Sequence, residues 1–344
     1  MVLLANSATL GLLCKVLDRI GRPQYLENVL AHQGLPLQLL DAPDILFPLS
    51  QLPTVFESTL RTAGVHALAR HAHGLCRFSD LGLFGRYVTA APDLETALCR
   101  AHKAHRYHAS GSTFGLDVQG RRVRWSYHSV ANGWHGWRHV ADLTAVLLTD
   151  LVRGYAGPRW RPAVVEVDYP EPAHSEDLEA VLEAPVLYNR PSVAIAFERD
   201  LLSRPRQWCG TSVGFGDLRR LVVARPPADF AGIVRKLIQL RLLDGHTDID
   251  GVAVLLDMGA RTLQRRLREQ GPSYRDVLVE ARMRRAVELL TLTREPIAEV
   301  AFSLGYSSAT HMSRAFKRSL GRTPSELRAS DPGRLSHMGA RQVL

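Results

Sequence analysis

The sequence predicts two domains, an α+β domain with a mostly antiparallel sheet over residues 1–210 and an all-α domain over residues 229–330. In the second domain, two helix-turn-helix units are joined by a long helix. Three observations lead to this fold class. Helix-like and strand-like periodicities are mixed in the first two thirds of the chain, and only helix-like periodicity follows. The proline pair Pro226-Pro227 separates the two parts. The 344 residues, of which 46% are hydrophobic, are enough for two separate cores.

In the amino-terminal domain, apolar residues recur at helix spacing in some segments and alternate with polar residues in others. The strands that this alternation predicts are too few for a two-sheet jelly roll. Gln119-Gly120-Arg121 is predicted to turn a hairpin between two of the strands. Helices are expected at Ser7 to Ile20, Tyr25 to His32, Leu52 to Ala72, Leu94 to Tyr107, Gly136 to Arg153 and Ser175 to Glu183. Strands are expected at Leu83 to Thr89, Ser112 to Val118, Arg122 to His128, Ala163 to Tyr169 and Val193 to Phe197.

A linker is expected over residues 211–228 and a flexible tail over residues 331–344. The linker is predicted to contain a short helix, Asp217 to Ala224, followed by the proline pair. Because prolines stiffen a linker, motion in one domain can be transmitted to the other.

The carboxy-terminal domain repeats one helix-turn-helix pattern, first in Gly251 to Leu267 and again in Glu299 to Phe316. Each copy has a small alanine, an apolar residue three positions later, and two apolar residues four positions apart in its second helix. The spacing predicts that one face of each second helix is buried and the opposite face is free. A long helix, Tyr274 to Leu290, joins the copies. The matching residues are Ala253 and Ala301, Leu256 and Leu304, and the pairs Leu263 with Leu267 and Met312 with Phe316.

The free faces carry the side chains that DNA bases and phosphates bind. Arginine and glutamine can form paired hydrogen bonds with guanine and adenine, and threonine or alanine methyls can contact thymine. We expect no carboxylate on these faces, because phosphates repel it. Residues 259–328 hold fourteen Lys and Arg against seven Asp and Glu, so +7 of the chain's formal +9 lies there. The exposed residues are predicted to be Arg261, Thr262, Gln264, Arg265 and Arg268, then Ala309, Thr310, Ser313, Arg314 and Lys317, with His311 at the boundary.

Arginine at helix spacing more often marks a solvated surface than a base-reading face. Two copies with matching core positions favour DNA binding over that interpretation. A sensor or scaffold protein whose basic domain docks to acidic partners is the first alternative, and an enzyme fused to a DNA reader is the second.

The carboxy-terminal domain, from about Phe230 to Arg328, resembles that of the AraC/XylS transcription regulators. The similarity is strongest from Ile297 to Arg328, and the ARMRRAVELL segment of the joining helix also matches. Two residues depart from the family in the first unit, where Asp257 replaces the usual turn glycine and Gly259 the usual serine cap. Because Asp tolerates a left-handed backbone and Gly is an acceptable cap, we expect the unit to fold. The matching signature residues are Ala301, Leu304, Gly305, Tyr306, Arg314, Phe316, Lys317, Gly321, Pro324 and Arg328.

The resemblance implies that the two second helices enter successive major-groove segments on one face of DNA, about 34 Å apart. Lys317 and Arg318 would then hold phosphates, which position the protein without specifying a sequence. The base-reading residues implied by the resemblance are Arg261, Gln264 and Arg265 in the first unit, and Ala309, Thr310, Ser313 and Arg314 in the second.

The stretch from Tyr25 to Arg204 resembles the arabinose-binding-type, non-cupin sensor domain of such regulators, on the segments Leu46 to Leu52, Asp80 to Leu98, Arg161 to His174 and Phe197 to Pro205. It implies a domain that binds a small-molecule effector and dimerises, and the domain's name does not make arabinose the ligand. An apolar cavity with a few polar groups is the usual form of such a site. Aromatic residues can also be plain core. The residues expected to bind the effector are Trp125, Tyr127, Trp134 and Trp137.

Nine of the fourteen histidines lie between His66 and His139. His135 and His139 have the spacing of a shared metal ligand pair on a helix, but no carboxylate or cysteine completes a site. We therefore expect no metal, and ordinary surface or capping roles for these histidines. His102, His105 and His108 recur every three residues.

No enzyme motif stands out. The sequence has no G-x-S-x-G turn, and the glycines at 82 and 85 are not followed by the residues of a phosphate loop. Four scattered cysteines, Cys14, Cys76, Cys99 and Cys209, suit a reducing cytoplasm. The first twenty residues are expected to form an amphipathic helix, and the apolar run Leu143 to Val152 is too short to span a membrane.

The sequence thus predicts a cytoplasmic, sequence-specific transcription regulator without catalytic activity or cofactor. The expected partners are double-stranded promoter DNA, a small-molecule effector, RNA polymerase and a second copy of the chain, with no membrane.

Overall fold

The computed structural model describes residues 2–42, 44–172, 176–207, 213–214, 216–217 and 225–329. The chain divides into two compact units, one spanning Val2–Pro226 and the other beginning at Pro227. Most of the expected linker, the helix predicted at Asp217 to Ala224, the expected tail and Cys209 lie outside the described residues. Each unit is described by itself below.

A five-stranded sheet in the order β3-β4-β7-β5-β6 forms the centre of the amino-terminal unit. All neighbours are antiparallel except β5 and β6, which are parallel. The predicted hairpin joins β3 and β4 through residues 120–121, where Gly120 has a positive φ of 59°. The strands are β3 (Ser112–Gln119), β4 (Arg122–Ser129), β5 (Val164–Glu166), β6 (Val186–Leu187) and β7 (Val193–Glu198), and a separate pair is formed by β1 (Leu4–Asn6) and β2 (Leu46–Pro48).

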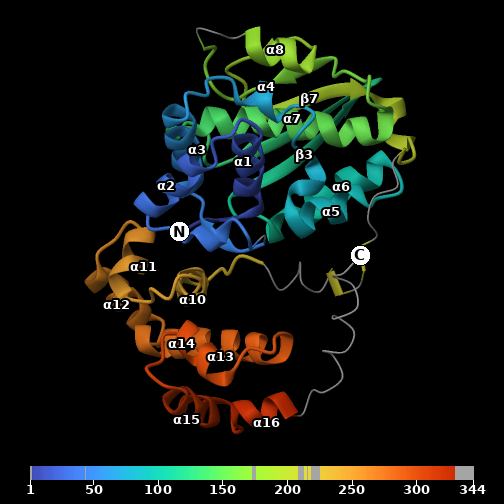
Figure 1. Ribbon diagram of the computed structural model, residues 1–344. Helices are drawn as coiled ribbons and strands as arrows, with labels where there is room; N and C mark the ends of the chain where they lie inside the picture. The colour runs from blue at the N-terminus through green and yellow to red at the C-terminus, as the bar shows by residue number, and fades with distance from the viewer. Residues whose placement is uncertain are drawn as a thin grey trace. The chain divides into compact units, whose positions relative to one another are not determined.

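Helices pack against this sheet around α7 (Trp137–Ala156), which is buried along most of its length. α7 contacts β7 as well as α3 and α4, so it lies between the sheet and those helices (Figure 1). Burial around α7 explains its nearly continuous apolar sequence. The other helices are α1 (Ala8–Arg19), α2 (Gln24–His32), α3 (Gln51–Thr62), α4 (Leu68–Ala72), α5 (Gly82–Thr89), α6 (Leu94–Ala104) and α8 (Glu176–Leu182), with 3-10 turns η1 (Leu37–Leu39), η2 (Phe78–Asp80), η3 (His105–Tyr107) and η4 (Arg199–Ser203).

The strand predicted at Leu83 to Thr89 is wrong, because this segment forms the helix α5. The buried residues Phe84 and Val88 are four positions apart, which is helix spacing, and Leu83 extends the same buried face. Gly85 allows the helix to pack against η2, since a Cβ there would lie 2.1 Å from the carbonyl oxygen of Phe78.

The single helix predicted at Leu52 to Ala72 is also wrong, because it is divided into α3 and α4. Gly64 ends α3 with a φ of 66°, and the amide of Val65 donates to the carbonyl of Leu60 at 2.9 Å. This is the glycine-based helix ending that a helix-period pattern alone does not reveal.

The carboxy-terminal unit is built from helices, as predicted. In Figure 1, the long helix α13 (Tyr274–Leu292) lies between α10 and the pair α15 and α16, and it contacts all three. Ser273 and Asp276 form a capping box at its start. The other helices are α10 (Phe230–Arg241), α11 (Ile249–Leu255), α12 (Ala260–Glu269), α14 (Ile297–Ser303), α15 (Ala309–Leu320) and α16 (Pro324–Ala329).

Among the residues that the structure describes, no helix combines the length and the apolar character needed to cross a membrane.

Candidate functional site

The first helix-turn-helix unit consists of α11 and α12. The carboxylate of Asp248 caps α11 by accepting a hydrogen bond from the amide of Gly251 at 2.7 Å, which lowers the pKa of Asp248. In the turn, Asp257 takes the left-handed conformation with a φ of 50°, and Gly259 stands at the N-cap of α12 with extended backbone angles. The unit therefore folds with the two residues by which it departs from the family, as the sequence predicted.

The second unit consists of α14 and α15. Gly305 turns the chain with a φ of 73°, and a Cβ there would lie 2.8 Å from Nη2 of Arg282. The hydroxyl of Ser308 caps α15 by accepting from the amide of His311 at 3.2 Å. This unit thus has the glycine turn and serine cap that the first unit lacks.

One face of each second helix is buried, as the spacing predicted. Leu263 and Leu267 of α12 and Met312 and Phe316 of α15 have no exposed surface. Ala253 and Ala301, the small residues shared by the two units, are also buried. The repeated apolar pattern therefore fixes which sides of α12 and α15 face outward.

The outward face of α12 carries the predicted cations. Arg261, Gln264, Arg265 and Arg268 are exposed and line one shallow hollow, and Thr262 is half-buried. Glu269 lines the same hollow at the end of the helix. The expectation that no carboxylate lies on these faces is therefore wrong at this one end of α12, because the last helical turn brings residue 269 round to the side of residue 265.

On α15, Thr310, Arg314, Lys317 and Arg318 are exposed, and Ala309 and Ser313 are half-buried. Within the described residues, no carboxylate forms an ion pair with the cations on the outward faces of α12 and α15. Two arginines of α13 differ, because Arg284 and Arg285 are paired with glutamates at 2.9 and 3.0 Å. The outward faces of α12 and α15 thus present cations that no carboxylate of the described residues neutralises.

A second candidate site lies inside the amino-terminal unit, where α5, α7, η3, β3 and β4 enclose a cavity of about 60 Å³. Of the four aromatic residues expected to bind an effector, only Tyr127 lines it. Trp125 is buried and stacks on Phe114, with ring centres 5.2 Å apart. Trp137 is buried and donates from Nε1 to Asp168 at 2.9 Å, while Trp134 is 39% exposed.

Two histidines of this cavity correct the expectation of surface or capping roles. His105 and His108 are 3% and 5% exposed, and both line the cavity. Burial lowers the pKa of His105 well below its usual value and that of His108 to about 4. A signal was present in the sequence, because residues 98, 101, 105 and 108 have the spacing of one buried helical stripe.

The other histidines have individual roles. His102 Nδ1 lies 2.6 Å from the carbonyl oxygen of Phe114, and His139 lies 3.0 Å from Glu57. In the described part of the chain, no three metal-ligating side chains gather in one place. His135 and His139 are therefore not joined by a third metal-ligating side chain within the described residues.

Two family profiles match the sequence. The arabinose-binding domain of AraC transcription regulators matches residues 25–206, and a helix-turn-helix domain matches residues 252–330. The first match alone covers more than half of the chain. The chain belongs to the AraC family of transcription regulators. It is therefore a DNA-binding transcription regulator with an arabinose-binding-type amino-terminal domain, in agreement with the resemblance predicted from the sequence.

Known regulators are similar in sequence to most of this chain. The chain is 28% identical to the ornithine utilization regulator of Pseudomonas aeruginosa, over 85% of this chain and 87% of that protein. It is 24% identical to the regulator VirS of Mycobacterium tuberculosis, over 74% of this chain and 77% of that protein. The crystal structure of the transcriptional regulator CdpR from Pseudomonas aeruginosa has 20% identity and a TM-score of 0.39, covering 89% of this chain and 97% of that one.

Proposed function

We propose that this AraC-type regulator reads promoter DNA with the outward faces of α12 and α15, and that a small molecule bound by the amino-terminal unit controls that reading. The observation that carries the first part is the pairing state of the cations. Within the described residues, Arg284 and Arg285 of α13 are paired with glutamates, whereas no carboxylate pairs with the cations on the outward faces of α12 and α15, so their donors are free for another acceptor. The phosphates and base edges of DNA are acceptors of this kind.

The residues of the two faces divide into two roles. Arg261, Gln264 and Arg265 on α12 would bind base edges in one major-groove segment, and Thr310 and Arg314 on α15 those in the next. The half-buried residues Thr262, Ala309 and Ser313 would add short contacts close to the helix axis. Arg268, Lys317 and Arg318, nearer the ends of their helices, would hold phosphates.

Control by an effector is supported by the buried cavity with its polar residues. A ligand changes DNA affinity only if it binds the DNA-competent arrangement of the protein differently from the incompetent one. Tyr127, His105 and His108 are the residues we assign to effector recognition. A second copy of the chain and RNA polymerase stay predictions as further partners.

Selection from a random-sequence DNA library with the full chain tests the DNA-reading role. We expect an enriched site that binds at least about a thousandfold more tightly than random DNA at physiological salt. A basic docking domain binds polyanions without such discrimination, since phosphate neutralisation is independent of sequence. Equal affinity for selected and random DNA would therefore support a docking domain and contradict the proposal.

A ligand screen tests whether an effector controls DNA binding. The full chain is heated with sugars, amino acids and alcohols, because a ligand that binds only the folded protein raises the thermal midpoint. Each compound that raises the midpoint is then added to the complex with the selected site, and we expect at least one to change the DNA affinity. If none changes it, effector control is wrong.

A further inference from the structure

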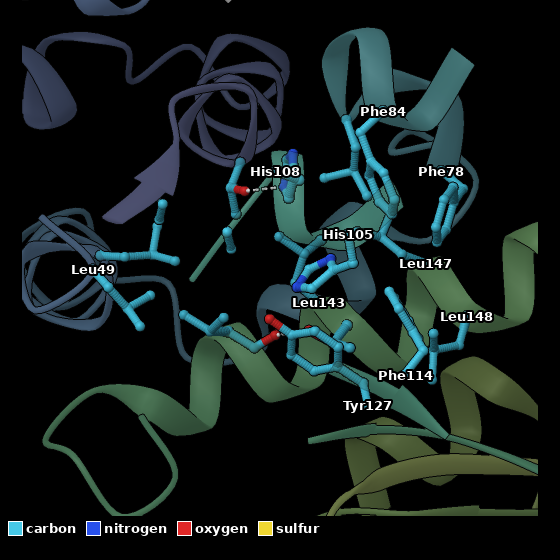
Figure 2. A pocket seen from close by; sticks show the side chains of 17 residues that line it. Leu49, Phe78, Phe84, His105, His108, Phe114, Tyr127, Leu143, Leu147 and Leu148 are labelled. Atoms are coloured by element: carbon cyan, nitrogen blue, oxygen red, sulfur yellow. Dashed lines mark hydrogen bonds between the residues drawn. The ribbon is translucent and has the colours of Figure 1, made fainter. Parts of the chain in front are cut away.

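The cavity of the amino-terminal unit has an apolar wall with a small polar region. Leucines and phenylalanines from η2, α5, α7, β3 and the start of α3, with the residues next to these elements, supply about half of the lining (Figure 2). Among the seventeen lining residues there is no aspartate, glutamate, lysine or arginine. The polar side chains are Thr9, His105, His108, Tyr127 and Thr144.

Most of these polar groups are already satisfied within the protein. The hydroxyl of Thr144 donates to the carbonyl of Val140 at 2.7 Å, and Thr9 lies 3.5 Å from Nε2 of His108. The hydroxyl of Tyr127 interacts with the side chains of two serines, Ser112 and Ser129. The remaining polar capacity of the cavity therefore belongs to the two histidines.

Three imidazole nitrogens have no hydrogen-bond partner within the protein, namely Nδ1 and Nε2 of His105 and Nδ1 of His108. The ring of His105 stands edge-on to Tyr127 and the ring of His108 stacks on Phe84, so apolar and aromatic groups surround both (Figure 2). A buried polar atom without a partner is destabilising, and native proteins rarely leave one so. Three of them at one cavity indicate a place for a ligand's polar group.

We propose that this cavity binds a small, uncharged alcohol, whose hydroxyl group donates to one imidazole nitrogen and accepts from another. The proposal rests on the effector control proposed above and names the ligand's chemical class. A neutral imidazole has one donor and one acceptor nitrogen, and a hydroxyl has both functions in a single atom. Both rings are neutral at pH 7, because burial keeps their pKa values low.

The same lining excludes other classes of ligand. A carboxylate or an ammonium group would be buried without a countercharge, which is strongly unfavourable. A diamino acid such as ornithine carries three charges, and a sugar carries more hydroxyl groups than three nitrogens can satisfy.

The size of the cavity limits the carbon skeleton. An engineered cavity of about 150 Å³ binds benzene, and the volume here is about 60 Å³. Without movement of the walls, an alcohol with a short carbon chain is the ligand that fits.

The test compares three probes that share one carbon chain: ethanol, acetate and ethylamine. Each is titrated into the full chain labelled with ¹⁵N at histidine, near pH 7.5, and the nitrogen signals of His105 are followed. We expect ethanol to shift them saturably, and acetate and ethylamine to bind at least tenfold more weakly. Equal binding by a charged probe, or no response of the His105 nitrogens to ethanol, would overturn the proposal.

Two variants provide a matched control. His105→Phe removes both unpaired nitrogens and keeps a planar ring, so we expect a higher thermal midpoint and at least tenfold weaker ethanol binding. His105→Gln retains a donor and an acceptor and should keep most of the binding. Unchanged ethanol binding in His105→Phe would contradict the proposal, and the titration of the unaltered protein stands even if a variant does not fold.

DNA affinity separates this inference from effector control. If ethanol binds but the affinity for the selected DNA site does not change, the ligand class is supported and effector control through this cavity fails. If L-arabinose or L-ornithine shifts the His105 nitrogens and changes DNA affinity while ethanol does neither, effector control stands and the ligand class is wrong.

Discussion

Replacing Arg265 by alanine tests base reading on α12, with Arg266→Ala as a control of equal charge. Arg265 is exposed on the hollow face of α12, whereas the guanidinium of Arg266 lies 5.8 Å from the ring centre of Phe230. Each substitution removes one positive charge from the same helix. Only Arg265 lies on the face proposed to meet base edges, where its guanidinium could form two hydrogen bonds with a guanine.

The expected effects differ in size and in selectivity. A paired arginine–guanine contact is worth about 1–3 kcal/mol of discrimination, which corresponds to about 5- to 150-fold in affinity. Arg265→Ala should weaken binding to the selected site by that factor and leave random-DNA binding within about threefold. Arg266→Ala should weaken both DNAs equally and slightly, and should reduce the stability of the unit by about 0.5–1 kcal/mol through its lost contact with the Phe230 ring.

Fluorescence anisotropy at fixed salt measures both affinities, because the salt concentration alone changes binding strongly. Changing the contacted guanine to adenine completes a double-mutant cycle. This base change should weaken DNA binding by the unaltered protein but have little further effect on DNA binding by the Arg265→Ala variant. Equal losses on selected and random DNA, or additive effects of the base and the arginine, would refute base reading by Arg265.

Three further predictions concern the phosphate contact, the core and the buried histidines. Lys317→Ala should weaken binding to selected and random DNA alike, and should make the slope of log affinity against log salt concentration shallower by about 0.9. An unchanged slope would count against a phosphate contact. Phe316→Ala leaves a cavity at a fully buried position and should lower the free energy of unfolding of the carboxy-terminal unit by about 3–5 kcal/mol, measured by urea denaturation. The control Lys317→Ala, at an exposed position, should lower it by about 0.5 kcal/mol or less. The lowered pKa values of His105 and His108 mean that below pH 6.5 the unfolded chain binds protons that the folded protein refuses. The stability that depends on these neutral histidines is therefore complete above pH 6.5, and below it should fall by about 1.4 kcal/mol per pH unit for each histidine that stays neutral in the folded protein. For His108 this loss ends near its folded pKa of about 4. A double His→Phe variant that loses stability as steeply would contradict this.

The carboxy-terminal unit was predictable because each of its signals is local. The alanine, the turn residue and the pair of apolar residues lie within one helix-turn-helix unit, and two copies reinforce one another. Even the unusual turn residue Asp257 could be assigned a left-handed backbone from its chemistry. Glu269 was missed because it follows the last periodic position, where the end of the helix decides which way a side chain faces.

The amino-terminal unit was harder to predict from sequence. In α5, hydrophobic residues dense enough to suit either a strand or a helix were interpreted as a strand, and the close packing of Gly85 on η2 is visible only in three dimensions. The strands β1, β2 and β6 have only two or three residues each, too few for a recognisable alternation. The cavity is assembled from segments far apart in the chain, which sequence patterns do not bring together. Of the four aromatic residues predicted to bind an effector, only Tyr127 lines it.

Hydroxyl-radical footprinting of the full chain on its selected site tests the central claim most directly, namely that α12 and α15 read adjacent turns of one DNA duplex. Two protected segments are predicted on the same face of the DNA, with centres about 10 base pairs apart. Arg314→Ala should reduce the protection of one segment, and Arg265→Ala should reduce the protection of the other. A single protected segment, or two on opposite faces of the duplex, would contradict the account.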